Sequence, residues 1–292
     1  MDYPPLPEAL TVGVYDNHTH LETSLDPETK LDYREQLDRA SSVGVRGVVQ
    51  VGGDVETSRW SAEIALREPR VLAAVALHPN EVPGISELDS ALAQIDALAG
   101  QPRVRAVGET GLDYFRTRGE SDRAAQLRSF EAHIEIAKRH NIALQIHDRD
   151  AHADVIATLL RVGAPERTVF HCFSGDAEMA RVCVEHGWYL SFAGTVTFKN
   201  APNLREALVA IPRSRILIET DAPFLTPEPM RGRPNSSYLI PYTLRAMAGY
   251  LETEVTMLAA QITSTTEEVY GRWNDEPVLV DGASALPPAA LA

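Results

Sequence analysis

Cysteine is scarce in this chain, and long apolar runs are missing. The 292 residues include two cysteines, Cys172 and Cys183, which do not form a C-x-x-C pair. We therefore expect no disulfide framework and a reduced, cytoplasmic protein. No apolar run approaches the roughly 18 residues of a membrane span. The first residues, MDYPPLPEALT, also lack the basic and apolar regions of a signal peptide.

Basic residues are few relative to acidic ones. The chain has 27 Lys and Arg against 41 Asp and Glu, which gives a net charge of −14. This balance argues against a non-specific binder of nucleic acid or of anionic membranes, because such proteins carry a basic patch. It still allows a small site that handles phosphate. The sequence shows no sign of an obligate protein partner.

Apolar, β-branched runs alternate with segments of helical spacing along most of the chain. In the clearest helical segment, Leu127, Phe130 and Ile134 recur at steps of three and four residues. Eight such runs separated by helices predict a (β/α)8 barrel, a fold of roughly 250 residues, with a doubly wound open sheet as the competing architecture. The predicted strands lie at 12–17, 45–51, 71–77, 104–108, 142–146, 167–172, 188–193 and 215–219.

One domain accounts for residues 1–274 in this interpretation. Residues 238–271 have the pattern of two extra helices packed outside the barrel. Residues 275–292 are rich in Pro and Ala, and we predict that they form a flexible C-terminal tail.

Side chains of the metal-ligand types follow the predicted strands, always on the carboxyl side. Any one of them alone would more often be a hydrogen-bonded core residue or a helix cap than a ligand. In a closed barrel, however, the carboxyl ends of the strands converge on one mouth, where barrel enzymes place their chemistry. The residues are His18, His20, His78, Glu109, His147, His171, Glu219 and Asp221.

The spacing of His18 and His20 is informative in itself. Residues two apart on a strand point to the same face, so both imidazoles face the barrel interior. Imidazoles suit Zn, Mn, Co or Fe, and carboxylates add Mg and Mn. The set holds more ligands than one tetrahedral ion uses. A pair of ions bridged by a carboxylate, the arrangement of two-metal hydrolases, accounts for the excess.

Six segments of the chain together resemble the TatD family of metal-dependent hydrolases, within the amidohydrolase-like barrels. They are DNHTHLE, LHP, GETGLDY, IHDRDA, FHCFSG and ETDAPFL, spread from residue 16 to about residue 235. The resemblance implies a TIM barrel that binds one or two divalent cations (Zn, Mg or Mn). Many family members are DNases that act on DNA ends.

The resemblance also assigns roles to residues. It implies that His18, His20, Glu109 and Asp221 hold one ion and that Glu109, His147 and His171 hold the second. Glu109 would bridge the ions and Asp221 would be the general base. The chain departs from the family pattern at Asn17, where Thr is usual, and at Asn80, where a second His is frequent; neither change removes a ligand.

The substrate is less firmly indicated than the metal chemistry. His78, Arg116 and Arg149 are the predicted substrate contacts, with Lys199 and Arg231 as further candidates. DNA ends or single strands fit a chain of this net charge better than long duplex. The alternative enzyme is an amidohydrolase or esterase that acts on a small amide, lactone or carboxyl ester. A non-enzymatic metal-binding barrel is the third possibility.

Overall fold

The computed structural model describes residues 2–26, 28 and 30–274. Its eight strands form one sheet, in which they follow one another in chain order from β1 to β8. The chain divides into two compact units. The first comprises Met1–Val49 and Val169–Glu268, and the second comprises Gln50–Thr168 and the described residues from Val269 onward. The predicted C-terminal tail, 275–292, lies outside the described residues.

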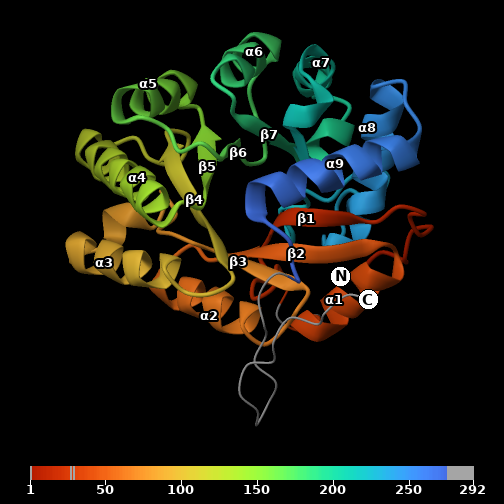
Figure 1. Ribbon diagram of the computed structural model, residues 1–292, viewed down its shortest axis with the longest axis horizontal. Coiled ribbons are helices and arrows are strands. Elements are labelled where there is room, and N and C mark those ends of the chain that lie inside the picture. Colours follow the sequence, from red (N-terminus) through yellow and green to blue (C-terminus); the bar gives the residue numbers. More distant parts are fainter. Residues whose placement is uncertain (1, 27, 29, 275–292) are drawn as a thin grey trace. The chain divides into compact units, whose positions relative to one another are not determined.

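The first unit carries the two ends of the strand series (Figure 1). Its strands β1, β7 and β8 are buried along their whole length, as expected for parallel strands that are covered on both faces. Its elements are β1 (Val14–Thr19), α1 (Tyr33–Ser42), most of β2 (Val45–Val51), most of β6 (Thr168–Phe170), α6 (Ala177–Glu185), β7 (Tyr189–Phe192), α7 (Pro202–Ala210), β8 (Ile216–Ile218), α8 (Ile240–Tyr250) and most of α9 (Val255–Tyr270). Short 3-10 helices lie at Gly194–Thr197, Arg213–Arg215 and Ser237–Leu239.

The second unit contains the middle of the series, with helices α3, α4 and α5 packed against β4 and β5 (Figure 1). Aspartates begin helices in both units. Asp54 forms a capping box with Thr57 before α2, and the Asp176 side chain accepts from two amides at the start of α6. The elements are α2 (Val55–Ala65), β3 (Val71–Val75), the 3-10 turn Val82–Gly84, α3 (Leu88–Ala99), β4 (Val104–Asp113), α4 (Glu120–His140), β5 (Ala143–Arg149) and α5 (His152–Val162).

The first and last strands meet within the first unit. Thr19 forms a parallel bridge with Ala222, and the His20 amide donates to the Ala222 carbonyl over 2.8 Å. The Asp221 amide donates in turn to the His18 carbonyl over 3.0 Å. Eight parallel strands in chain order, with the first hydrogen-bonded to the segment after the last, define the (β/α)8 barrel. The predicted fold class is therefore confirmed, and α8 and α9 are the two extra helices expected in 238–271.

Two strands extend further than the sequence indicated. β4 continues to Asp113, whereas the apolar run predicted an end at residue 108, and β5 continues to Arg149 instead of residue 146. Glycine makes the extension possible at one point. Gly111 has φ +146°, and a Cβ there would lie 2.0 Å from the His147 carbonyl oxygen. Glu109 and His147 thus lie within paired strands and not beyond them.

Among the described helices, none is long and apolar enough to cross a membrane.

Candidate metal centres

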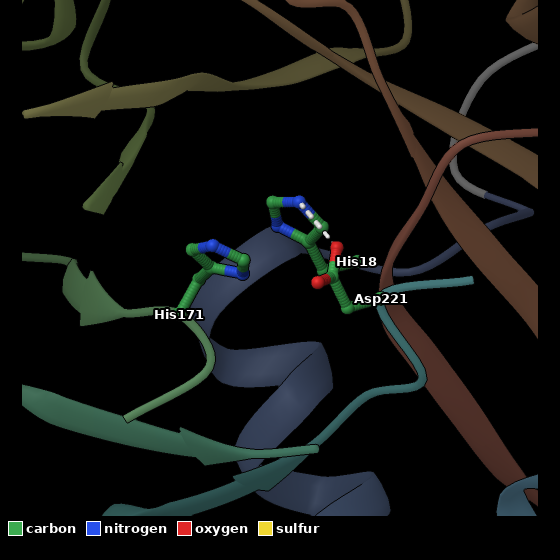
Figure 2. Close-up of side chains that lie close together, drawn as sticks. All are labelled: His18, His171 and Asp221. Carbon is green, nitrogen blue, oxygen red and sulfur yellow. Dashed lines mark ion pairs between the residues drawn. The ribbon is translucent and has the colours of Figure 1, made fainter. Parts of the chain in front are cut away.

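Three predicted ligands of the first unit come together at the ends of β1, β6 and β8. One donor atom from each of His18, His171 and Asp221 lies within 4.8 Å of the others. Figure 2 shows the two imidazoles facing each other with the Asp221 carboxylate beside His18; the ring centroids are 3.8 Å apart and the Nε2–Oδ1 distance is 3.9 Å. His18 is fully buried, and 14% of the Asp221 side chain is exposed.

His20 joins this cluster through the same carboxylate. Its Nε2 lies 3.6 Å from Asp221 Oδ1, and its Nδ1 lies 3.9 Å from Glu22. The β1 spacing thus places both histidines of the HTH segment beside Asp221, as the period of two predicts. A carboxylate that faces two imidazoles can serve as a metal ligand or can exchange a proton with a bound water.

Glu219 holds the His171 ring in place. Its Oε1 lies 3.0 Å from His171 Nδ1 and accepts from the Cys172 amide over 2.8 Å. A hydrogen on Nδ1 leaves the Nε2 lone pair for a metal, which is the usual arrangement of a carboxylate behind a metal-binding histidine. Glu219 is fully buried, and its Oε2 has no hydrogen-bond partner among the described residues.

Buried polar residues form hydrogen bonds between the strands that carry the first cluster. The Asp16 carboxylate accepts from the Thr220 amide over 2.9 Å and from the Thr220 hydroxyl over 2.5 Å. Burial raises the pKa of Asp16 to about 7, against the lowering effect of these hydrogen bonds. Asn17 donates to Ser191 Oγ over 2.8 Å and to the Ile218 carbonyl over 2.5 Å. The Asn17 side chain therefore links β1 to β7 and β8 through hydrogen bonds. An amide serves at this position because its NH2 group can donate to both partners.

Within the second unit, three residues form a group of their own, His78, Glu109 and His147, whose donor atoms also lie within 4.8 Å of one another. Glu109 Oε1 is 2.5 Å from His147 Nδ1 and 3.3 Å from His78 Nε2. The Glu109 side chain is 6% exposed, against 16% for His147 and 20% for His78. The sequence predicted His78 as a substrate contact, and its position is equally suited to a third ligand.

Asp113 supports His147 from the far end of β4. Its Oδ2 lies 3.1 Å from His147 Nε2 and accepts from Asn80 Nδ2 over 3.0 Å, while its Oδ1 accepts from the Arg116 amide over 2.8 Å. Burial raises the pKa of Asp113, but these hydrogen bonds outweigh it and hold the pKa well below the usual range. Asn80, where the family frequently has His, thus serves as a donor to this carboxylate.

Helix α4 supplies two more buried supports. Gln126 Oε1 accepts from the Asp113 amide over 3.0 Å, and its Nε2 donates to the Pro79 carbonyl over 2.9 Å. His133 Nε2 accepts from the Leu77 amide over 3.1 Å, and its Nδ1 lies 2.7 Å from the Ser129 carbonyl. Burial lowers the pKa of His133 to about 4, so the ring is neutral at pH 7.

The other two predicted substrate contacts, Arg116 and Arg149, are on the surface of the second unit, and the further candidates Lys199 and Arg231 are on the surface of the first. Arg116 and Arg149 are exposed, and the Arg149 guanidinium lies 4.0 Å from the centroid of the Phe115 ring.

The sequence singled out Glu219 as a residue of metal-ligand type without giving it a role, and it did not single out Asp113. The sequence contained a signal for both, because each is a carboxylate at the end of a strand. Glu219 follows β8 in the segment ETD, and Asp113 ends β4 in the segment GLD.

Both groups have the donor chemistry of a divalent cation site. Each combines imidazole nitrogens with one carboxylate, a set that suits Zn, Mn or Fe. His171 and His147 each have a carboxylate at one ring nitrogen, Glu219 and Asp113 respectively, which orients the ring. The residues present therefore fit a bound metal in each unit.

A barrel that gathers histidines and carboxylates at the carboxyl ends of its strands has the ligands of a metal-dependent hydrolase at the position where barrel enzymes place their chemistry. Comparison with known families specifies this class further. The family model described as TatD related DNase matches residues 15–271. The chain belongs to the TatD family of metal-dependent hydrolases.

Several curated relatives share most of their length with this chain. An uncharacterized metal-dependent hydrolase TatD of Mycobacterium tuberculosis is 43% identical over 88% of this chain and 97% of its own length. The protein named 3'-5' ssDNA/RNA exonuclease TatD of Salmonella typhimurium is 32% identical over 82% of this chain and 93% of its own. Among solved structures, the TatD homolog YjjV of Escherichia coli has TM-score 0.81 at 25% identity, covering 89% of this chain and 98% of YjjV.

Proposed function

We propose that this enzyme is a divalent-metal-dependent deoxyribonuclease of the 3'-5' exonuclease kind, which hydrolyses phosphodiester bonds at DNA ends or in single strands. The observation that carries the proposal is the carboxylate of Asp221 beside two imidazoles, His18 and His20, at the carboxyl ends of β1 and β8. The name of the Salmonella relative, an ssDNA/RNA exonuclease, supports this substrate class.

We propose that His18, His20, His171 and Asp221 hold a cation in the first unit. The resemblance gave His171 to the second ion, but its donor atom lies within 4.8 Å of those of His18 and Asp221, which supports the first. In the second unit, Glu109 and His147 hold a cation, and His78 is placed to be a further ligand. The bridging role of Glu109 stays a prediction. A divalent cation at these positions would lower the pKa of a water toward neutrality and stabilise negative charge on a phosphoryl oxygen.

Asp221 is the proposed proton acceptor for the attacking water. Its side chain is partly exposed, so solvent reaches it, and its backbone is fixed by the hydrogen bond from its amide to the His18 carbonyl. A carboxylate within reach of the nucleophile contributes to the rate by removing or directing its proton. Glu109 is buried and has His78 and His147 within 3.3 Å of one oxygen, so its proposed role is ligation.

The exposed arginines favour a phosphodiester over a small amide or carboxyl ester. Arg149 is the last residue of β5 and pairs with Asp113, the residue that ends β4 and supports His147. Arg116 lies three residues after Asp113. Guanidinium groups match phosphate oxygens, whereas an amidase pocket has less use for them. The expectations of a cytoplasmic location and of no obligate protein partner stay predictions.

The test is a hydrolysis assay with metal-stripped enzyme to which Zn, Mn or Mg is restored. The substrates are single-stranded DNA, RNA and a small carboxyl ester, each with Asp221→Asn as the matched control. We expect metal-dependent release of nucleotides from DNA by the wild-type enzyme and its loss in the variant. Hydrolysis of the ester with no cleavage of either nucleic acid would replace the nuclease with the esterase alternative.

A further inference from the structure

Two phenylalanines of the described chain are strongly exposed, and both follow a carboxylate of a candidate metal centre. Phe115 is 50% exposed and lies two residues after Asp113; Phe224 is 41% exposed and lies three residues after Asp221. Single exposed apolar side chains are common on protein surfaces, so the informative observation is the position of these two rings and not their exposure alone. The buried phenylalanines, by contrast, are Phe130, Phe170, Phe173 and Phe192.

Phe115 is held in place without being covered. The Arg149 guanidinium lies 4.0 Å from its ring centroid, and Arg149 pairs with Asp113 in the β4–β5 register. The Tyr114 amide donates to the Arg149 carbonyl over 2.9 Å, so the two strands remain paired up to this point. Phe115 therefore lies in the turn directly after β4, the strand that carries Glu109, and the residue is 50% exposed to solvent.

Phe224 is held in a similar way in the first unit. Its ring centroid lies 6.2 Å from that of His20, edge to face, and its amide donates to the Asp221 carbonyl over 2.9 Å. Its own carbonyl accepts from Nδ2 of Asn235, which is buried. The turn after β8 thus fixes an open aromatic ring beside the first cluster.

Charge alone does not explain how such a chain would hold a nucleic acid. The net charge is −14. In the chain segments that follow β4 and β5, the exposed arginines 116, 118 and 149 are matched in number by the exposed acids Glu120, Asp150 and Asp154. The acids offset part of the attraction of Arg116 and Arg149 for phosphates, and stacking of bases on aromatic rings is the other main source of affinity for single strands. Stacking tolerates any sequence and needs unpaired bases, because bases in a duplex already stack on one another.

We propose that Phe115 and Phe224 are stacking surfaces for unpaired bases of a single-stranded nucleic acid end. Each ring holds a base next to one of the candidate metal centres and so makes single strands better substrates than duplex. Arg149 positions the Phe115 ring, and the Asp221–Phe224 turn positions the other. This inference rests on the proposed nuclease function and specifies what that nuclease recognises.

The experiment compares two substrates with the metal-reconstituted enzyme: a single-stranded DNA oligonucleotide, and the same strand with abasic residues over its 3' end. For Phe115→Ala and Phe224→Ala we expect kcat/KM on the normal strand to fall roughly 5- to 150-fold, mainly through KM, as expected for loss of one stacked base. On the abasic strand the variants and the wild type should match. Phe115→Trp and Phe224→Trp should retain wild-type KM, because the larger ring also stacks.

Tyr250 provides the matched control. It is an exposed aromatic at the end of α8, 37% exposed, with the Arg205 guanidinium 5.6 Å from its ring centroid, and it does not belong to either cluster. Tyr250→Ala should leave both substrates unaffected. Equal losses on the normal and abasic strands, or unchanged kcat/KM in both Ala variants, would overturn the stacking role while the nuclease stands. Absence of cleavage of either strand by the wild-type enzyme would overturn the nuclease function itself, and the stacking role with it.

Discussion

The two candidate metal centres contain the same kinds of ligand but are supported in different ways. In the first unit, the support comes from the strands themselves: Asp16 and Asn17 of β1 hydrogen-bond to Thr220, Ser191 and the Ile218 carbonyl. In the second unit, it comes largely from helix α4, through Gln126 and His133. One fold can thus fix catalytic side chains either by strand pairing or by a helix packed behind them.

The ligands also differ in exposure. His18 and His171 of the first unit are almost completely buried, whereas His78 and His147 of the second are 20% and 16% exposed. The side chain of Asp221, the carboxylate of the first cluster, is 14% exposed. We therefore propose that proton transfer takes place in the first unit, and we expect the second to tolerate more variation in its ligands.

The largest expected effect is that of Asp221→Asn. Asn keeps the shape of the side chain but cannot accept a proton at neutral pH, so kcat should fall roughly 10²- to 10⁴-fold. Steady-state hydrolysis of single-stranded DNA measures this change. Glu109→Gln, the corresponding substitution in the second unit, should act through loss of metal, so added metal should partly restore its rate. Because Asp221 is proposed both as a ligand and as the proton acceptor, added metal should not return Asp221→Asn to the wild-type rate, and full restoration would contradict the division of roles.

A second prediction concerns the helix support and its pH dependence. The pKa of His133 is lowered to about 4 from 6.5, so the unfolded chain takes up a proton first as the pH falls. The stabilisation by neutral His133 is complete above pH 6.5 and is lost as the pH falls toward 4, a change of about 3 kcal/mol in the free energy of unfolding.

Urea unfolding of the metal-free protein at several pH values measures this loss. In His133→Gln, the pH dependence between 6.5 and 4 should be shallower than in the wild type, although the variant is less stable at every pH. His140→Gln removes a histidine from the same helix and serves as the control. Identical slopes in His133→Gln and the wild type would show that His133 does not titrate in this range.

The smallest expected effect is a difference in metal affinity between variants of two carboxylates: Asp113, which contacts His147, and Glu219, which contacts His171. Asp113 accepts hydrogen bonds on both oxygens, so Asp113→Asn turns an NH2 group toward a donor and should weaken metal affinity roughly 10- to 100-fold. Glu219 uses one oxygen, and Oε2 has no partner among the described residues, so Glu219→Gln can place its NH2 group there. Glu219→Gln should therefore weaken metal affinity less than Asp113→Asn does. Metal titration of both variants measures the difference, and a larger loss in Glu219→Gln would reverse it.

Much of this fold could be predicted from the sequence, because hydrophobic periodicity and the residues that end helices and strands follow from local chemistry. The alternating apolar runs indicated all eight strands, and residues 238–271 indicated α8 and α9. The strand ends were less accurate. β4 runs on to Asp113 through polar residues, since Gly111 allows close pairing with β5 and burial there depends on neighbouring strands and not on apolar character.

The supporting residues could not be predicted for a related reason. His133 and Gln126 read as ordinary members of an amphipathic helix, and only packing shows that they contact Leu77 and Asp113. Asn17 had no explanation in the sequence, because its partners lie on β7 and β8, more than 170 residues away. Residues of the metal-ligand types at strand ends can be recognised from the local sequence. The residues that support them depend on which strands and helices pack together, and in which register.

The measurement that tests the central claim most directly is the metal content of purified variants by elemental analysis. The variants are His18→Ala/His20→Ala in the first unit and His147→Ala in the second, with His140→Ala as a control on the surface of α4. We predict that both site variants contain less metal than the wild type and that His140→Ala matches it. Wild-type metal content in both site variants would contradict the assignment of these clusters as metal centres.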